Sequence, residues 1–230
     1  MALAKYGGII SELRGKEAGV IFSRNAYGSY MKQKVSPVNP QTQNQLGQRT
    51  LMGNLAQTWA GLTSGQKESW DNLGAQVTRV NRFGDTTYYT GFSLFMKLNR
   101  NLVLCGSAAL DEAPAVSEMP VLAVTAFAAD VSDTAINITF TPTPVPANHK
   151  VFFYLTNNIL TGRRFVKNYY RLVNKYAAAG ASPADVYADW LAYYGNALVA
   201  GAKLFLKAKL VNSATGFEGV PATSSCTVIA

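Results

Sequence analysis

The pattern of apolar residues changes once along the chain, and this change most constrains the fold. Before about residue 108 the apolar residues recur every three or four positions, as in amphipathic helices. After residue 121 they form short runs bounded by proline, asparagine and glycine, as in strands. A stretch of proline, acidic and small residues separates the two patterns. We therefore expect an α+β fold with two domains, residues 1–113 and 121–230, joined by a linker at residues 114–120.

The first domain is predicted to start with a β-hairpin. Two β-favouring runs, residues 19–24 and 29–35, flank the turn-like sequence Asn-Ala-Tyr-Gly. Strand alternation places Tyr30, Lys32 and Lys34 on one face of this hairpin. One face is therefore expected to be cationic, with an aromatic ring at its end.

Three helices are predicted after the hairpin. Asn39 is expected to cap the first helix, with Pro40 at the first helical position, and this helix is expected to end near Leu62. Thr63 and Gln66 have the spacing of a capping box for the second helix. A loop is expected at residues 81–90, followed by a third helix that ends before Gly106.

The second domain is predicted to be an antiparallel β-sandwich. Five segments have strand composition and are separated by turn-rich sequence, which is typical of such folds. One helical insertion is expected around residues 166–195, with its N-terminal cap at residues 182–185. The predicted strands are residues 121–127, 135–141, 151–156, 203–211 and 223–229.

Positive charge is concentrated in the first part of the chain. Residues 1–105 contain 12 Lys+Arg against 5 Asp+Glu, whereas residues 106–230 contain 9 against 8. A basic half joined to a nearly neutral half favours an anionic partner for the basic half. We expect the residues around the hairpin to bind either nucleic acid or an acidic neighbouring subunit. These residues are Arg14, Lys16, Arg24, Tyr27, Tyr30, Lys32 and Lys34, and a secondary basic patch comprises Arg163, Arg164 and Lys167.

The sequence offers little material for catalysis. Its only histidine, His149, lies in a proline-rich turn and is interpreted as a solvated loop residue. No metal-ligand spacing occurs, so we expect no metal, no cofactor and no enzymatic activity. The apolar runs are too short to span a membrane, and residues 1–8 lack the pattern of a signal peptide. Cys105 and Cys226 are most simply free thiols.

Four blocks in the first half resemble a family associated with phage and prophage gene clusters. In this family a G-K-x-G-x-V-x-[FY]-S-R-N-x-x-G-x-Y block is followed by P-x-N-P-x-T-x-x-Q, by a block with two tryptophans, and by a G-[FY]-x-L-F block. The corresponding segments here are residues 15–30, 37–45, 56–70 and 90–99, with Ala18 as one departure in the first block. The resemblance implies a viral setting and no particular chemistry.

Two local resemblances are also present. Residues 55–75 are similar to the central helices of an HMG box, and residues 91–100 are similar to its first helix, in a permuted order. Residues 204–228 are similar to the closing hairpin of a fibronectin type III domain. The first resemblance implies DNA binding, and the second implies a fibronectin-like sandwich.

We therefore expect a non-enzymatic bacteriophage virion structural protein, capsid-associated or at the head–tail connection, and anchored through its basic N-terminal half. It would be made in the host cytoplasm and contact capsid, portal or connector subunits in a symmetric assembly of several copies, together with packaged DNA, and no membrane. The alternative is a DNA-binding architectural protein acting through residues 1–105. A third interpretation, a glycan-binding sandwich, would need an exposed aromatic platform, for which Tyr193 and Tyr194 are candidates.

Overall fold

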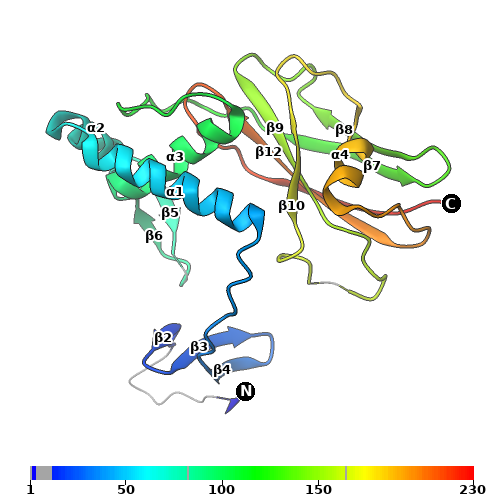
Figure 1. Ribbon diagram of the computed structural model, residues 1–230, viewed down its shortest axis with the longest axis horizontal. Coiled ribbons are helices and arrows are strands. Elements are labelled where there is room, and N and C mark those ends of the chain that lie inside the picture. Colours follow the sequence, from blue (N-terminus) through cyan, green and yellow to red (C-terminus); the bar gives the residue numbers. More distant parts are fainter. Residues whose placement is uncertain (1, 4–11, 82, 164) are drawn as a thin grey trace.

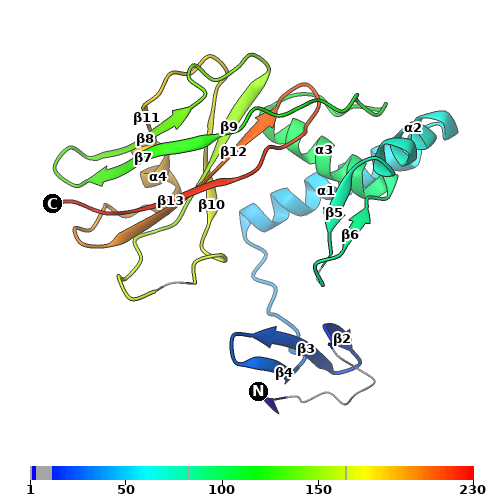
Figure 2. The ribbon, with the colours of Figure 1, turned by 180° about the vertical axis from the view of Figure 1, so that it is seen from behind.

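The fold is α+β and its sheets are antiparallel (Figure 1). The computed structural model describes residues 2–3, 12–81, 83–163 and 165–230. Along the chain, a small N-terminal sheet is followed by a group of helices and then by two further sheets with one short helix. Seen from behind, the N-terminal sheet lies at the end of an extended segment, apart from the C-terminal sheets (Figure 2).

The N-terminal sheet has four strands in the order β1-β4-β3-β2. The predicted hairpin is confirmed, because β3 and β4 pair in antiparallel register from Val20 opposite Gln33 to Asn25 opposite Gly28. The short strands β1 and β2 add one edge each. The strands are β1 (Ala2–Leu3), β2 (Gly15–Glu17), β3 (Val20–Asn25) and β4 (Gly28–Gln33).

Helix α1 (Gln43–Gly61) begins later than the sequence predicts. Thr42 is its N-cap and accepts a hydrogen bond from the backbone N–H of Gln45. The predicted start at Asn39 and Pro40 is wrong because Gln41 has a φ of 48°, in the left-handed region, which interrupts helical backbone. The side chain of Asn39 instead accepts a hydrogen bond from Arg49 at 2.7 Å.

The start of the second helix and the end of the third agree with the caps that the sequence predicts. Thr63 and Gln66 form both hydrogen bonds of a capping box at the start of α2 (Ser64–Gly74). Helix α3 (Gly91–Cys105) ends at Gly106, whose φ of 82° is readily adopted by glycine. The two helices pack around Trp70 and Phe95, which are fully buried with ring centroids 5.2 Å apart.

Within the loop predicted at residues 81–90, residues 86–88 form the strand β6 (Thr86–Tyr88), which pairs with β5 (Thr78–Val80) as a β-hairpin whose turn lies in the predicted loop. The turn is closed by Asn81, whose side-chain oxygen accepts hydrogen bonds from the backbone N–H groups of Phe83, Gly84 and Asp85. The polar composition of this segment indicates a loop, but its threonine and tyrosine residues favour a strand.

The C-terminal part contains two antiparallel sheets that share one hydrophobic core. The sheets have the orders β11-β8-β7 and β10-β9-β12-β13. Phe140 from the first and Phe153 from the second meet edge to face, with centroids 5.9 Å apart. All five predicted strands are present, with ends shifted by a few residues. They are β7 (Ala123–Asp130), β8 (Ala135–Thr141), β9 (His149–Leu155), β12 (Lys203–Asn212) and β13 (Ala222–Thr227).

The helical insertion predicted around residues 166–195 is much shorter than expected. Helix α4 covers only Tyr187–Tyr194, and the same range contains the strands β10 (Arg171–Tyr176) and β11 (Ala184–Asp185). The predicted cap fails because Asp185 lies in a strand, where its carboxylate accepts the backbone N–H groups of Ile136 and Tyr187. Helix α4 covers the core with Trp190, which is fully buried and donates its indole N–H to the carbonyl of Thr156.

Helix α3 is joined to the C-terminal sheets by hydrogen bonds and by a small apolar cluster. The Asn101 amide donates to the carbonyl of Gly216 at 2.9 Å, and Lys150 donates to the carbonyl of Cys105 at 2.6 Å. Cys105, Phe152 and Val211 are buried together at the same junction. Both cysteines are free thiols, and burial raises the pKa of Cys226 to about 11.

Glu218 forms an ionic link at this junction. Its carboxylate lies 3.5 Å from the Nζ of Lys97 on α3 and 2.9 Å from the Nζ of Lys209 on β12. Burial by itself would raise the pKa of Glu218, but the hydrogen bond from Lys209 and the charges of Lys209 and Lys97 bring that pKa below its ordinary value.

We expect these two ionic contacts to make the folding stability of the chain depend on pH. Because the pKa of Glu218 is lowered on folding, its contribution is present above the pKa of the unfolded chain and is lost as pH falls through the folded pKa. As the pH is lowered below about 5, the free energy of unfolding measured with urea should fall less steeply for Glu218→Gln than for the natural chain. Equal slopes for the two proteins would contradict this assignment.

Candidate interaction surfaces

One face of the N-terminal sheet carries lysines from two strands. Ile21 lies opposite both Lys16 on β2 and Lys32 on β4, so these three side chains form a row on one face. Tyr30, opposite Ser23, belongs to the same face. The backbone N–H of Lys34 donates to the carbonyl of Gly19 at 2.8 Å, so the ladder continues past the end of β4.

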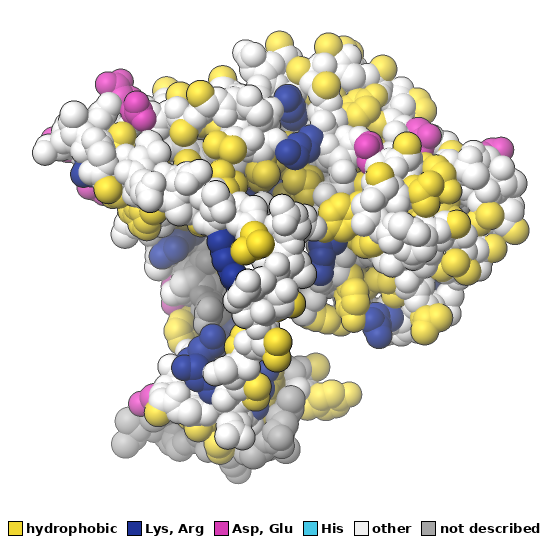
Figure 3. Space-filling view, in the orientation of Figure 1, with side chains coloured by type: hydrophobic (Ala, Val, Ile, Leu, Met, Phe, Trp, Pro, Cys, Tyr) yellow, Lys and Arg dark blue, Asp and Glu magenta, His cyan; other side chains and the backbone are white. Residues whose placement is uncertain are grey.

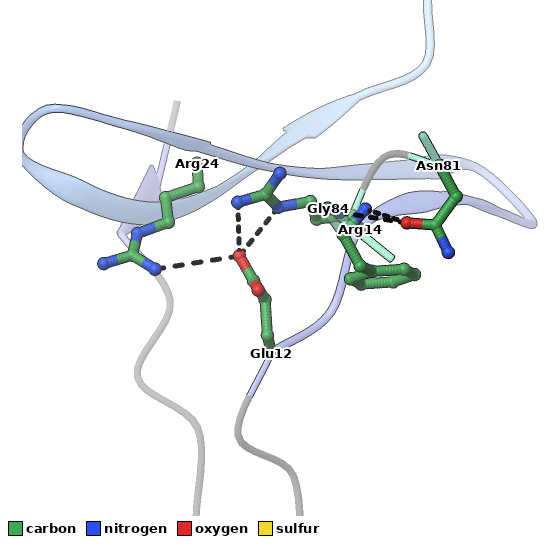
Figure 4. A network of polar contacts seen from close by, with 6 residues as sticks. Glu12, Arg14, Arg24, Asn81 and Gly84 are labelled. Carbon is green, nitrogen blue, oxygen red and sulfur yellow. Dashed lines mark hydrogen bonds and ion pairs between the residues drawn. The ribbon is translucent and has the colours of Figure 1, made fainter. Parts of the chain in front are cut away.

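The two arginines of the predicted site lie differently. Glu12 accepts a hydrogen bond from Arg14 at 2.7 Å and lies 3.7 Å from the guanidinium of Arg24 (Figure 4). The register places Arg24 with Phe22, on the face opposite Lys16 and Lys32. One carboxylate thus offsets part of the arginine charge, and the cationic face of the sheet consists of lysines.

The hairpin turn presents the most exposed aromatic side chain of the predicted site. Tyr27 is 91% exposed, and its backbone N–H is held by the side chain of Asn25 at 2.9 Å. Exposure of an aromatic ring to water is unfavourable, and covering the ring with a partner surface is favourable.

The sheet of residues 12–35 has no core of its own among the described residues. Phe22 and Met31 are opposite each other and only partly covered, and no described side chain of this segment is buried or belongs to the cores of the helices or of the C-terminal sheets. Residues 34–42 form no helix or strand and are exposed. Figure 3 shows this sheet as a lobe below the helices and the C-terminal sheets. A sheet of this kind gains stability when a further layer covers one face.

A second surface is a groove of about 910 Å³ between the start of α1, the end of α3 and strand β10. Four basic side chains line it: Arg49, Arg100, Arg171 and Lys175. No carboxylate is among the residues that line it. Lysine and arginine side chains lie along the seam between the helices and the C-terminal sheets in Figure 3.

The arginines of the groove are held by neutral groups. Arg100 donates to the side chain of Gln48 at 3.4 Å, and Arg171 donates to the carbonyls of Asn168 and Tyr170. No ion pair within the described part of the chain includes Arg49, Arg100, Arg171 or Lys175. No ion pair within the described residues therefore offsets the positive charge of the groove.

Sequence reasoning missed this groove because its residues come from several distant elements. The register of β10 against β9 shifts between Leu172 and Asn174, and this irregularity places Leu172 and Lys175 on the same face. Strict alternation would assign them to opposite faces. The nearly neutral charge of residues 106–230 also gave no indication that this half contributes cations to a basic surface.

The secondary basic patch is only partly described. Arg163 lies over the ring of Tyr169, with its guanidinium carbon 5.0 Å from the ring centroid, and hydrogen-bonds to the Tyr169 hydroxyl. Lys167 is exposed in the same loop. Arg164 lies outside the described residues. Arg163 is thus engaged by an aromatic partner within its own loop.

The other candidate residues lie apart from these surfaces or in the core. His149 is the first residue of β9 and is half-buried, so the interpretation as a solvated loop residue is wrong. The turn at Ala147 and Asn148, which follows Pro146, ends where the strand begins. Tyr194 donates to the carbonyl of Leu155 and packs against Trp190, whereas Tyr193 lines the groove. Within the described residues, no group of three His, Cys, Asp or Glu side chains is placed to hold a metal ion, and no helix has the length and hydropathy needed to cross a membrane.

Comparison with models of known families, with curated proteins and with solved structures finds no match for this chain.

Proposed function

We propose that this chain is a non-enzymatic structural protein of a bacteriophage particle, capsid-associated or at the head–tail connection. The observation that carries the proposal is the N-terminal sheet of residues 12–35, which has no buried side chain among its described residues and is joined to the helices by an exposed segment. Elements of this kind are stabilised by contact with other subunits, as in symmetric assemblies of several copies. The phage-like blocks, which include this sheet, support the same setting.

In this proposal the lysine face of the sheet binds an acidic surface on a capsid, portal or connector subunit. Lys16 and Lys32 are exposed and lie on either side of Ile21 in one row across the sheet, and Tyr27 is exposed at the hairpin turn. The lysines would steer and orient the contact, while Ile21, which is partly covered on the same face, would supply apolar contact area.

In this proposal the chain forms two domains with separate roles. We propose that residues 1–113 form the anchoring domain and that residues 121–230 form a fibronectin type III-like sandwich that contacts neighbours. Support for the sandwich comes from its seven strands, which are divided into sheets of three and four around one core. The strand order alone does not specify a function.

The second candidate function is DNA binding through residues 1–105. The shared face of Lys16 and Lys32, with Tyr30 on the same side, is the observation that favours it. The two functions predict different effects of the same substitutions.

The variant Lys32→Glu plus Lys34→Glu distinguishes them. If the sheet is an assembly element, we expect particle incorporation to fall by about ten-fold or more, while affinity for duplex DNA changes by less than about two-fold. Incorporation is measured by complementation and quantitative mass spectrometry, and DNA affinity by fluorescence anisotropy. The charge-matched control Arg163→Glu plus Lys167→Glu should be incorporated normally. A steep loss of DNA affinity with normal incorporation would instead favour the DNA-binding function.

A further inference from the structure

We propose that the groove between α1 and β10 binds a single strand of nucleic acid. This inference does not depend on the chain being a virion protein, because it rests on the charge, the aromatic content and the shape of the groove. It also differs from DNA binding through residues 1–105, since Arg171 and Lys175 lie outside that range.

The charge of the groove points to a polyanion. Arg49, Arg100, Arg171 and Lys175 converge on one concave surface, and none forms an ion pair with a described residue. Like charges gathered in this way repel one another, and an anion in the groove relieves that repulsion. Arginine also matches phosphate geometry through two parallel hydrogen bonds.

The aromatic residues of the groove favour nucleic acid over a simple anion. Tyr193 is 41% exposed and is available for a base to stack against. Tyr154 and Tyr170 are half-buried in the same wall, and burial raises the pKa of both hydroxyls, so they remain protonated hydrogen-bond donors. Amide side chains from the first turns of α1, including Asn44 and Gln48, complete the lining with groups that both donate and accept.

The shape favours a single strand. The volume of about 910 Å³ lies within the roughly 300–1,000 Å³ of typical ligand pockets, which accommodates a few nucleotides and not the width of a duplex. The junction of α3 with the sheets fixes the two walls relative to each other, so little ordering accompanies binding. A second copy of this chain is a poorer occupant, because each copy carries a net charge of +8.

The test measures the binding of a fluorescent oligothymidylate of about 12 nucleotides by anisotropy over a series of salt concentrations. Arg100→Gln plus Lys175→Gln removes two charges from the groove, and Arg163→Gln plus Lys167→Gln removes two exposed charges outside it. We expect the groove variant to bind about ten-fold more weakly, with the slope of log affinity against log salt reduced by about 1.4, because about 0.7 of a counterion is released per phosphate of a single strand. The control variant should change affinity by less than about two-fold.

A second measurement on the natural chain guards against a variant that folds poorly. A strand containing 5-iodouracil is irradiated with the protein, and the cross-linked peptide is identified by mass spectrometry. We expect the cross-link at Tyr170 or Tyr193. The proposal is overturned if the natural chain does not bind the strand, if both double variants lose affinity equally, or if the cross-links lie only outside the groove. It is also overturned if a polyglutamate of equal charge displaces the strand completely at equal concentration, since the groove would then fit an acidic protein segment.

Discussion

Deletion of residues 1–36 is expected to leave the stability of the remaining chain nearly unchanged while reducing its incorporation into particles by about ten-fold or more. The first effect follows because no described side chain of this segment is buried in the cores of the helices or the C-terminal sheets. The second follows if the N-terminal sheet is the element that attaches the chain to its neighbours.

Thermal unfolding and quantitative mass spectrometry of particles check the two halves of this prediction. A chain in which only Ser36, Pro37 and Val38 are replaced by glycine is the matched control, because it keeps the sheet and changes only the connecting segment. The control should be incorporated normally. A large loss of thermal stability in the deleted chain would show that the sheet is part of the main fold, and normal incorporation of the deleted chain would contradict its role in assembly.

Replacement of Gly216 by alanine is expected to destabilise the chain by about 3 kcal/mol or more. Gly216 has a φ of 77°, and a Cβ atom there would lie 2.3 Å from the backbone carbonyl oxygen of Leu98 on α3. A backbone atom in a helix cannot move aside as the end of a flexible side chain can. The substitution would therefore push α3 away from the sheets and disturb the hydrogen bond from Asn101 to the carbonyl of Gly216.

Gly195→Ala is the matched control for this substitution. Gly195 has a similar φ of 70°, but a Cβ atom there meets nothing within 4 Å, so only the conformational cost of about 1 kcal/mol remains. Chemical denaturation of the two variants measures the difference. Equal destabilisation would mean that the close approach of residue 216 to α3 does not hold the two parts together.

Local signals in the sequence predicted much of the fold because the structures they specify are themselves local. The capping box of Thr63 and Gln66 uses groups three residues apart, and Gly106 ends α3 through its own backbone conformation. The strands at residues 135–141 and 203–211 carry enough β-favouring residues to be recognised without their partners.

The errors arose where distant contacts or single backbone angles decide the structure. The left-handed conformation of Gln41 delays the start of α1, although Asn39 and Pro40 have good helix-start composition. Pairing with β9 makes β10 a strand in a range whose overall composition indicated a helix. Neither effect has a signature within a short window of sequence.

The candidate surfaces show the same division. Alternation along one strand was sufficient to place Tyr30 and Lys32 together. By contrast, the basic groove forms only when α1 and α3 pack beside β10. This packing places Arg49 and Lys175 on the same surface. Such a surface depends on tertiary structure and could not be predicted from charge distribution along the chain.

Our proposal that this chain is a structural component of a phage particle can be tested by quantitative mass spectrometry of purified particles, normalised to the major capsid protein. We expect the chain to be present at a constant ratio from one preparation to the next. A low ratio would indicate the head–tail connection, and a ratio near that of the capsid protein would indicate a lining or decoration of the capsid. Absence from purified particles, with the protein abundant in the infected cell, would contradict the proposal.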